Sequence, residues 1–327
     1  MRAIVITMPG QPDVLEQQDR PVPEPGLGQI RVRVHASALN RADLMQRAGT
    51  YPAPPGAPPD IPGLEYAGAV DALGAGATLW PVGTRVMGIT GGGAHAEYLC
   101  VHEREVLAMP CNLSWEEGAA IPEVFLTAYD ALFRQLDIRA GERVLVHAIG
   151  SGVGTASLQL AQLAGATVYG TSRSSAKLVK ARELGLDHTI DASAGDWVAQ
   201  VEERAGRDGI HAIVDLVGGE YFGANLRVLA SRGRVVVVGL TAGSRSELDL
   251  SIVLRKRLHI VGTVLRARPI EEKIALAREF SERVVPLFEA GRLRPVIEHV
   301  FPFSHIRAAH ELLESNVTFG KVVLSWD

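Results

Sequence analysis

The sequence has little of several features that mark specialised classes of protein. It contains only two cysteines, Cys100 and Cys111, in 327 residues, which excludes a disulfide framework and a four-thiolate zinc site. No apolar run approaches the length of about 18 residues that a membrane-spanning helix needs. The first residues lack the apolar core of a signal peptide. We therefore expect a soluble, cytoplasmic protein.

Basic residues are not in excess either. The sequence has 33 Lys and Arg and 37 Asp and Glu, which gives a net charge of −4. This balance argues against a nucleic acid as the main partner, because nucleic-acid-binding surfaces are rich in basic residues. The chain otherwise has an ordinary globular composition, with 47% hydrophobic and 21% charged residues. At about 100–200 residues per domain, its length predicts two domains.

The first 120 residues are rich in strand patterns. Residues 30–36 (IRVRVHA) alternate apolar and polar side chains, as a half-buried strand does. Six prolines within residues 52–62 exclude a helix or a central strand there and predict an extended surface loop. Short apolar runs bounded by Gly, Pro or Asp predict further strands at residues 3–6, 67–70, 85–89 and 97–101.

From about residue 120, strands alternate with helices. This alternation is typical of right-handed βαβ units, which build a parallel sheet buried on both faces. A long amphipathic helix is predicted at residues 270–290, and the short strands and helix after it are expected to pack on the N-terminal β domain. We predict strands at residues 143–147, 167–171, 211–215, 234–238 and 258–264, and helices at 152–164, 174–184 and around 221–229.

The glycine-rich segment 150–154 (GSGVG) joins the first of these strands to a helix. Such a turn allows a pyrophosphate to approach the backbone closely, where the N–H groups and the positive dipole end of the helix bind it. Its spacing departs from a strict GxGxxG, and similar turns occur without ligands. Within a complete βαβαβ series we interpret it as a dinucleotide-binding turn.

The end of the second strand in this series favours NADP(H) over NAD(H). An acidic residue there would bind the ribose 2′-hydroxyl of NAD. The segment 170–177 (GTSRSSAK) has no carboxylate and instead carries Ser172, Arg173 and Lys177, which suit a 2′-phosphate. Cations at the start of a helix are otherwise unfavourable, and a bound phosphate accounts for them.

Motifs for metal or nucleophilic catalysis are missing. Ten histidines are scattered without an HExxH motif, and there is no CxxC or GxSxG motif. Asp43, Glu65 and Asp215 are candidate acids, although a single carboxylate near a strand end is more often structural. A bound nicotinamide would carry the reaction without help from a metal.

Segments 37–51 (SALNRADLMQRAGTY) and 62–68 (PGLEYAG) resemble the zinc-independent quinone oxidoreductases of the medium-chain dehydrogenase/reductase superfamily. The chain resembles in particular the subgroup that contains the tumour-suppressor-inducible quinone oxidoreductase. The resemblance covers nearly the whole chain, and further matching segments are residues 91–93, 121–129, 151–156, 265–268 and 319–323.

This resemblance implies an α/β fold with two domains. A Rossmann domain, a doubly wound parallel sheet, is expected at residues 123–267 and would bind NADP(H). A GroES-like catalytic domain with a small β-barrel is expected at residues 1–122 and 268–327. The resemblance also implies a homodimer, and we expect the apolar strand at residues 258–265 to form its interface, because an exposed sheet edge needs a partner.

The resemblance further implies that no zinc is bound. Zinc-dependent relatives have a cysteine where this chain has Asn40 and a histidine where it has Leu64, which cannot bind zinc. Many relatives also carry a tyrosine near position 192 in the 2′-phosphate region, where this chain has Ala192, and Arg173 is expected to compensate.

The residues implied for the site fall into two sets. The candidate catalytic residues beside the acceptor are Tyr51, Asn40 and Asp43. The candidate cofactor-binding residues are Thr127, Ser151, Gly152, Val153, Ser172, Arg173, Lys177, Val217, Gly239, Leu240 and Leu265.

The implied activity is NADPH-dependent reduction of a quinone, by hydride or by single electrons, without a metal. Reduction of the activated C=C bond of an enone or enal is an alternative, because the same cleft and hydride would serve. A non-catalytic NADPH-binding redox sensor is the alternative from another class.

Overall fold

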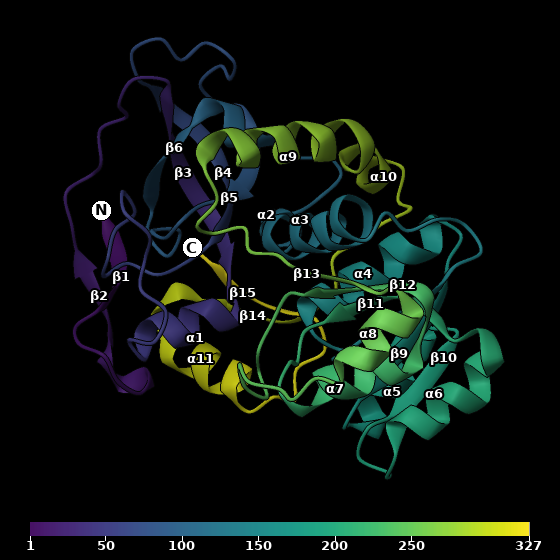
Figure 1. The fold of residues 1–327 in the computed structure, drawn as a ribbon. Helices are drawn as coiled ribbons and strands as arrows, with labels where there is room; N and C mark the ends of the chain where they lie inside the picture. Colours follow the sequence, from purple (N-terminus) through teal and green to yellow (C-terminus); the bar gives the residue numbers. More distant parts are fainter. Residues whose placement is uncertain (327) are drawn as a thin grey trace. The chain divides into compact units, whose positions relative to one another are not determined.

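The computed structural model describes residues 1–326, apart from the side chain of Arg207, and consists of two compact units (Figure 1). Unit 1 comprises Met1–Leu126 and the chain from Leu265 onward, and unit 2 comprises Thr127–Val264. The α/β fold class expected from the sequence is confirmed, with a parallel Rossmann sheet in unit 2 and a GroES-like β domain in unit 1.

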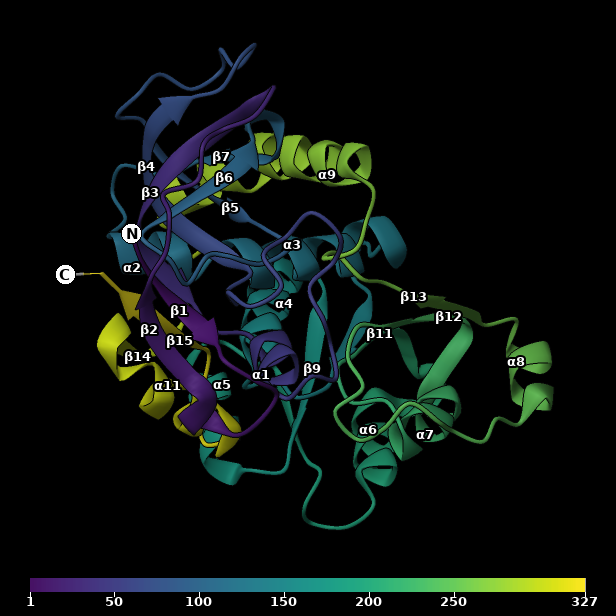
Figure 2. The ribbon, with the colours of Figure 1, turned by 90° about the vertical axis from the view of Figure 1, so that its left-hand side faces the viewer.

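Unit 1 contains a seven-stranded sheet in the order β14-β15-β3-β4-β5-β7, with β6 also paired to β3 (Figure 2). Both β6 and β15 pair with β3, at its two ends, and the register between β3 and β4 shifts twice. Such irregularities bend a strand, as a curved sheet requires. The strands are β3 (Gln29–Ala38), β4 (Glu65–Leu73), β5 (Arg85–Ile89), β6 (Tyr98–His102), β7 (Leu107–Ala108), β14 (Ile297–Pro302) and β15 (Lys321–Ser325).

The alternation of apolar and polar residues at 30–36 predicts a half-buried strand, and β3 has this burial pattern. Ile30, Val32 and Val34 are buried in one hydrophobic cluster, while the residues between them are more exposed. Unit 1 also contains an antiparallel hairpin of β1 (Arg2–Ile6) and β2 (Leu15–Asp19). Its helices are α1 (Arg41–Arg47), α2 (Trp115–Ala119), α9 (Ile270–Arg283), α10 (Val285–Glu289) and α11 (Ile306–Glu314), and α3 (Pro122–Tyr129) runs from unit 1 into unit 2.

The single long helix predicted at residues 270–290 is wrong. The structure has two helices there, α9 and α10, which meet at Val284 with φ −113°. Pro286 lies in the first turn of α10, and a proline has no N–H to continue the hydrogen-bond ladder of the preceding helix. The proline therefore starts a new helix.

Unit 2 contains a six-stranded parallel sheet in the order β10-β9-β8-β11-β12-β13 (Figure 1). Counted from β8, this is the order of dinucleotide-binding Rossmann sheets, in which ligands bind where the order reverses, here between β8 and β11. The strands are β8 (Arg143–Val146), β9 (Thr167–Ser172), β10 (His188–Asp191), β11 (Ile210–Asp215), β12 (Leu229–Val237) and β13 (His259–Gly262), and the helices are α4 (Gly152–Leu163), α5 (Ser175–Glu183), α6 (Trp197–Ala205), α7 (Glu220–Val228) and α8 (Leu250–Lys256).

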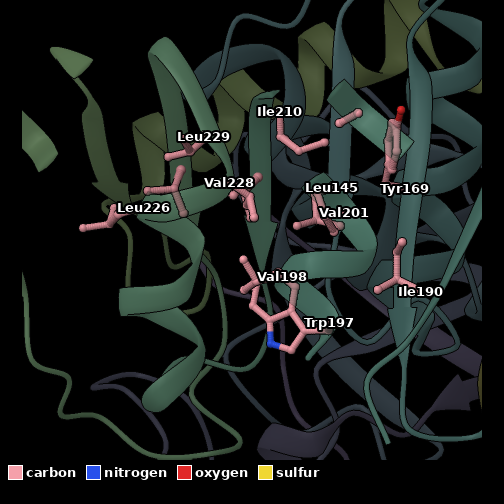
Figure 3. Packing of buried hydrophobic residues seen from close by; sticks show 13 residues of the cluster. Leu145, Tyr169, Ile190, Trp197, Val198, Val201, Ile210, Leu226, Val228 and Leu229 are labelled. Atoms are coloured by element: carbon pink, nitrogen blue, oxygen red, sulfur yellow. The ribbon is translucent and has the colours of Figure 1, made fainter. Parts of the chain in front are cut away.

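One face of this sheet packs on α6 and α7 through a continuous hydrophobic cluster (Figure 3). Trp197, Val198 and Val201 of α6 lie in this cluster with Leu226 of α7. The sheet residues in it are Leu145, Tyr169, Ile190, Ile210, Ile213 and Val235. The packing fixes the ends of the strands that carry the candidate cofactor residues.

None of the helices in residues 1–326 is long and apolar enough to span a membrane.

Candidate functional site

The start of α1 positions two of the candidate catalytic residues. Asn40 precedes the helix, and its backbone N–H donates a hydrogen bond of 2.7 Å to Oδ2 of Asp43. The other carboxylate oxygen of Asp43 accepts a 2.9 Å bond from the N–H of Gly63. Burial raises the pKa of Asp43, and these two backbone donors oppose the rise. Asp43 is fully buried, so it holds Asn40 and the Gly63 segment in place from beneath the surface.

Asn40 also belongs to a buried ionic network. The Lys321 ammonium lies 2.7 Å from Oε1 of Glu65 and donates bonds of 2.6 Å to Oδ1 of Asn40 and to the carbonyl oxygen of Leu39. The amide group of Asn40 donates a 2.9 Å bond to the same Glu65 oxygen. The Lys321 and Glu65 side chains are 4% and 0% exposed, so all three N–H groups of the ammonium are used in a water-excluded place.

The other oxygen of Glu65 accepts a 2.8 Å bond from the backbone N–H of Glu123, in the first turn of α3. Burial raises the pKa of Glu65, while Lys321, Glu123 N–H and Asn40 act in the opposite direction. The Glu123 carboxyl group itself is partly exposed, and no hydrogen bond or ion pair joins it to another described residue. Burial and the neighbouring Glu65 raise the pKa of Glu123 to about 8. At neutral pH this carboxyl group is therefore mostly protonated.

Arg266 connects Tyr51, at the start of the proline-rich loop, to Gly91 and to helix α1. Its guanidinium donates a 2.9 Å bond to the carbonyl oxygen of Gly91, a 3.3 Å bond to that of Tyr51, and a third bond to Oε1 of Gln46. It also lies 5.0 Å from the centre of the Tyr51 ring, within cation–π range. Arg266 therefore fixes the backbone and the ring of Tyr51 together.

The predicted extended loop at residues 52–62 is confirmed, since it contains neither helix nor strand. A Cβ atom added to Gly91 would lie 2.9 Å from Cγ of Pro54, so the loop packs directly on the 91–93 segment. The Tyr51 side chain at the start of the loop is partly exposed. Unit 1 thus presents one aromatic ring on a rigid support.

The glycine-rich turn of unit 2 has the geometry of a phosphate-binding helix start. Ser151 caps α4 by accepting a 3.0 Å bond from the N–H of Gly154 to its hydroxyl oxygen. A Cβ atom at Gly154 would lie 2.5 Å from the carbonyl oxygen of Ala148, so only glycine fits there. Gly152 and Val153 form the first turn, whose N–H groups have no partner inside a helix.

The second candidate region lies at the end of β9. Ser172 accepts a 3.1 Å bond from the N–H of Ser174, which in turn caps α5 at the N–H of Lys177. Arg173 is exposed, and Lys177 is partly exposed. Burial raises the pKa of Tyr221, and the nearby charge of Arg173 opposes this rise. The turn therefore presents two cations and no carboxylate.

A buried network of hydrogen bonds around Asp215 fixes the ends of β11 and β12. Asp215 accepts bonds from the N–H groups of Val217 and Gly218 at 2.8 and 2.9 Å and from the Asn225 amide at 3.0 Å. Its own carbonyl oxygen accepts a bond from the N–H of Gly239. The candidate acid Asp215 is thus a buried structural group, which brings the candidate positions 217 and 239 to one sheet edge.

The same hydrogen-bond network continues through Asn225 to His147, a residue that was not predicted from the sequence. Its ring nitrogens lie 2.6 Å from Oδ1 of Asn225 and 2.9 Å from Oγ1 of Thr171. Burial lowers the pKa of His147. His147 directly follows strand β8, and this place before the glycine-rich turn is the signal that could have found it.

The remaining candidates are placed as follows. Leu240 follows Gly239 and is 52% exposed. Thr127 and Leu265 are both buried, and they mark the two points where the chain passes from one unit to the other. Lys321, Arg266 and Glu123 were not among the predicted site residues. Each lies in a segment that resembles the quinone oxidoreductases, but its partners are distant in the sequence.

No cluster of three or more potential metal ligands occurs among the described residues. Of the positions compared with zinc-dependent relatives, Leu64 is buried, and Asn40 accepts a bond from Lys321. The positive charge beside the buried Glu65 carboxylate is thus a lysine ammonium.

Two family models match the chain. Residues 26–111 match the alcohol dehydrogenase GroES-like domain, and residues 152–282 match the zinc-binding dehydrogenase domain. Among proteins of similar sequence, the rat quinone oxidoreductase is 31% identical over 99% of this chain and 97% of its own length. The mouse synaptic vesicle membrane protein VAT-1 homolog is 32% identical over 99% of this chain and 83% of its own length.

Solved structures agree in fold. An NAD-dependent alcohol dehydrogenase superposes with a TM-score of 0.87 at 35% identity, covering 100% of both chains. The Escherichia coli quinone oxidoreductase complexed with NADPH gives a TM-score of 0.88 at 27% identity, covering 99% of this chain and 100% of that one. The CurK enoyl reductase gives a TM-score of 0.89 at 28% identity, over 100% and 99% of the two chains. The chain therefore belongs to the medium-chain dehydrogenase/reductase superfamily, as an oxidoreductase related to the quinone oxidoreductases.

Proposed function

We propose that this protein is an NADPH-dependent quinone reductase that works without a metal, with unit 2 binding the cofactor and unit 1 the acceptor. One observation carries the proposal: in unit 1 a lysine ammonium pairs with the buried carboxylate, and the same unit holds a rigidly fixed aromatic ring that is partly exposed. A flat quinone needs stacking and a hydrogen bond more than a Lewis acid, because its own conjugation spreads the incoming charge.

The glycine-rich turn fits a dinucleotide. Gly154 leaves a cradle that a side chain would fill, and the N–H groups of Gly152 and Val153 would hold the pyrophosphate together with the Ser151 hydroxyl. Ser172, Arg173 and Lys177 would hold the 2′-phosphate. When bound, the nicotinamide supplies a hydride from C4. The protein's own part is to orient the acceptor and to exclude water.

A steady-state assay tests the proposal. Purified protein is expected to oxidise NADPH in the presence of a quinone and to do so faster than in the presence of an enone or enal. A reversed preference would favour the alternative activity, C=C reduction, which the similarity to an enoyl reductase structure supports. Binding of NADPH without oxidation by any acceptor in the panel would favour a redox sensor.

Tyr51 is proposed to stack on the acceptor, with Asn40 and Asp43 fixing the wall beside it. Tyr51→Ala is expected to lower kcat/KM for a quinone by about 5- to 150-fold, because a stacking contact is worth about 0.5–1.5 kcal/mol and a hydrogen bond about as much again. NADPH affinity is expected to stay unchanged. Tyr51→Phe is expected to retain the stacking part of the rate. Enzyme kinetics and fluorescence titration of NADPH measure the two effects.

Tyr98 offers a matched control for this variant, since its ring lies 5.7 Å from the Arg31 guanidinium elsewhere in unit 1. Tyr98→Ala is expected to leave kcat/KM within about twofold of the wild-type value. If Tyr51→Ala reduced quinones at the wild-type rate, Tyr51 would be a structural loop residue and the acceptor wall would lie elsewhere.

Zinc independence is a further part of the proposal. Leu64 offers no ligand atom, and Asn40 Oδ1 and Glu65 Oε1 both contact the Lys321 ammonium, so a divalent cation would have to displace a paired charge. Purified protein is therefore expected to hold less than one tenth of an equivalent of zinc by elemental analysis and to keep its activity in EDTA. Loss of activity in EDTA and its recovery with zinc would contradict this.

We also propose a homodimer formed through β13. This strand is the last of the parallel sheet, so one of its edges has no strand partner among residues 1–326. Exposed apolar side chains gather in the same part of the chain, at Leu248, Leu250, Leu254, Ile260 and Val264. Pairing two such edges across a twofold axis would cover both.

A proline at position 260 tests this interface. The Thr263 N–H bonds to Val237 of β12, so by alternation the N–H of Val261 also faces β12 and that of Ile260 faces the open edge. Ile260→Pro is expected to leave the folded sheet intact and to shift dimer to monomer in light scattering. Val261→Pro, the contrast, is expected to destabilise the sheet itself. A native monomer of the wild-type protein at micromolar concentration would contradict the proposal.

A further inference from the structure

Asp43, Glu65 and Glu123 are the acidic residues bonded to, or part of, the network of Asn40 and Lys321, and Glu123 differs from the other two. Both oxygens of Asp43 accept backbone N–H bonds, and both oxygens of Glu65 accept bonds within the ionic network. These two carboxyl groups are also fully buried. The Glu123 carboxyl group is partly exposed, and only its backbone takes part in the network. It is thus an acid of this cluster that a ligand can reach.

We infer that Glu123 is the residue that donates the proton which completes reduction of the acceptor, an inference that rests on the proposed quinone reductase activity. Its place supports this role. The Arg266 guanidinium interacts electrostatically with both Tyr51 and Glu123 and lies over the Tyr51 ring. The charge of Arg266, which lies 5.0 Å from the centre of the Tyr51 ring, therefore also acts on the Glu123 carboxyl group.

The charges around Glu123 keep its proton in place. Glu65 on β4 and Asp43 on α1 disfavour a second negative charge, while Lys321 on β15 and Arg266 before α9 favour one. The start of α3 also favours a charged carboxylate, because the unpaired N–H groups of the first turn carry partial positive charge. Burial and Glu65 outweigh these effects, so the pKa of Glu123 is raised to about 8. Lys321, Asn40 and the Glu123 N–H all contact the Glu65 carboxyl group and favour its charged form, against the effect of burial.

Reduction of a quinone by a hydride needs one proton to give the neutral hydroquinone. A quinone that accepts a hydride becomes a hydroquinone monoanion, and one proton on its oxygen completes the neutral product. In the proposed step the O–H bond of Glu123 breaks, an O–H bond of the hydroquinone forms, and Glu123 is left as a carboxylate that regains its proton from water. The overall reaction consumes NADPH, a quinone and one proton and gives NADP⁺ and hydroquinone.

The test compares the wild-type protein with Glu123→Gln, which keeps the shape and the backbone bond to Glu65 but carries no acidic proton. General acid catalysis is worth about 10²–10⁴-fold, so kcat for a quinone near pH 7 is expected to fall by about 100-fold or more. The wild-type kcat is expected to fall as pH rises through about 8, because the protonated form is the active one. This pH dependence is expected to disappear in Glu123→Gln and to remain in Glu123→Asp.

Glu117→Gln is the matched control. Glu117 lies in the first turn of the neighbouring helix α2 and accepts a bond from the N–H of Ser114, which glutamine can also do. Its kcat and pH profile are expected to match the wild type. An unchanged kcat or an unchanged pH profile in Glu123→Gln would overturn the proton-donor role and leave the quinone reductase activity standing.

A second measurement needs neither cofactor nor acceptor. The infrared band of a protonated carboxyl group in the difference between wild type and Glu123→Gln is expected to vanish as pH rises through about 8. Loss of this band at the ordinary pKa of a glutamate, about 4.3, would overturn the proton donor alone. If the wild-type protein oxidised no NADPH with any quinone, the proposed function would fail and this role with it, whatever the infrared titration showed.

Discussion

Lys321→Met is expected to destabilise unit 1 by about 3–5 kcal/mol, because it leaves the Glu65 carboxylate buried without its cation. The loss of stability is expected to grow as pH rises. Without the ammonium, the folded state can only hold Glu65 in its protonated form, so its pKa when folded lies above its pKa when unfolded. The deficit is therefore smallest below about pH 4, where the carboxyl is protonated in both states, and grows as pH rises.

Urea unfolding at several pH values measures this effect. Arg104→Met is the control, since Arg104 pairs with Glu271 through two bonds on the surface, where an ion pair is worth about 1 kcal/mol or less. The double variant Lys321→Met with Glu65→Gln is expected to be more stable than Lys321→Met alone, because the buried charge is gone. Equal losses for Lys321→Met and Arg104→Met would contradict the buried network.

Much of unit 2 could be predicted from the sequence because its signals are local. A parallel strand buried on both faces shows as a short apolar run, and the predicted strand at residues 211–215 lies within β11. The short strand β10 (HTID) and helix α6 were missed. Strand β10 is four residues long, and three of the four are polar, so neither length nor periodicity identifies it.

The network in unit 1 could not be predicted in the same way. Lys321 and Glu65 lie far apart in the sequence, and nothing in either segment shows that β15 lies beside β3 and β3 beside β4. Resemblance to a family predicted Asn40 as a site residue, because it lies within the specific motif of residues 37–51. It did not reveal Arg266, because an arginine after a strand is more often exposed than bonded to three groups. The predicted site thus lacked its two buried cations.

The cofactor preference depends most on Arg173, and Arg173→Ala is expected to weaken NADPH binding by about 10- to 150-fold. A charge-assisted hydrogen bond is worth about 1.5–3 kcal/mol, which gives this range. Arg173 is exposed at the end of β9, where the turn to α5 contains no carboxylate that could bind a ribose hydroxyl instead. NADH lacks the 2′-phosphate, so its affinity is expected to change by less than about twofold.

Fluorescence titration with both cofactors separates this role from a general loss of charge. Arg182→Ala removes another cation from the last turn of α5, where its guanidinium bonds to Thr189, and is expected to leave both affinities unchanged. Because the two variants remove the same charge from opposite ends of α5, a difference between them measures the effect of position, as contact with the phosphate requires, rather than a general loss of positive charge from unit 2. Equal losses for NADPH and NADH in Arg173→Ala would assign Arg173 to the shared part of the dinucleotide and leave the preference to Ser172 and Lys177.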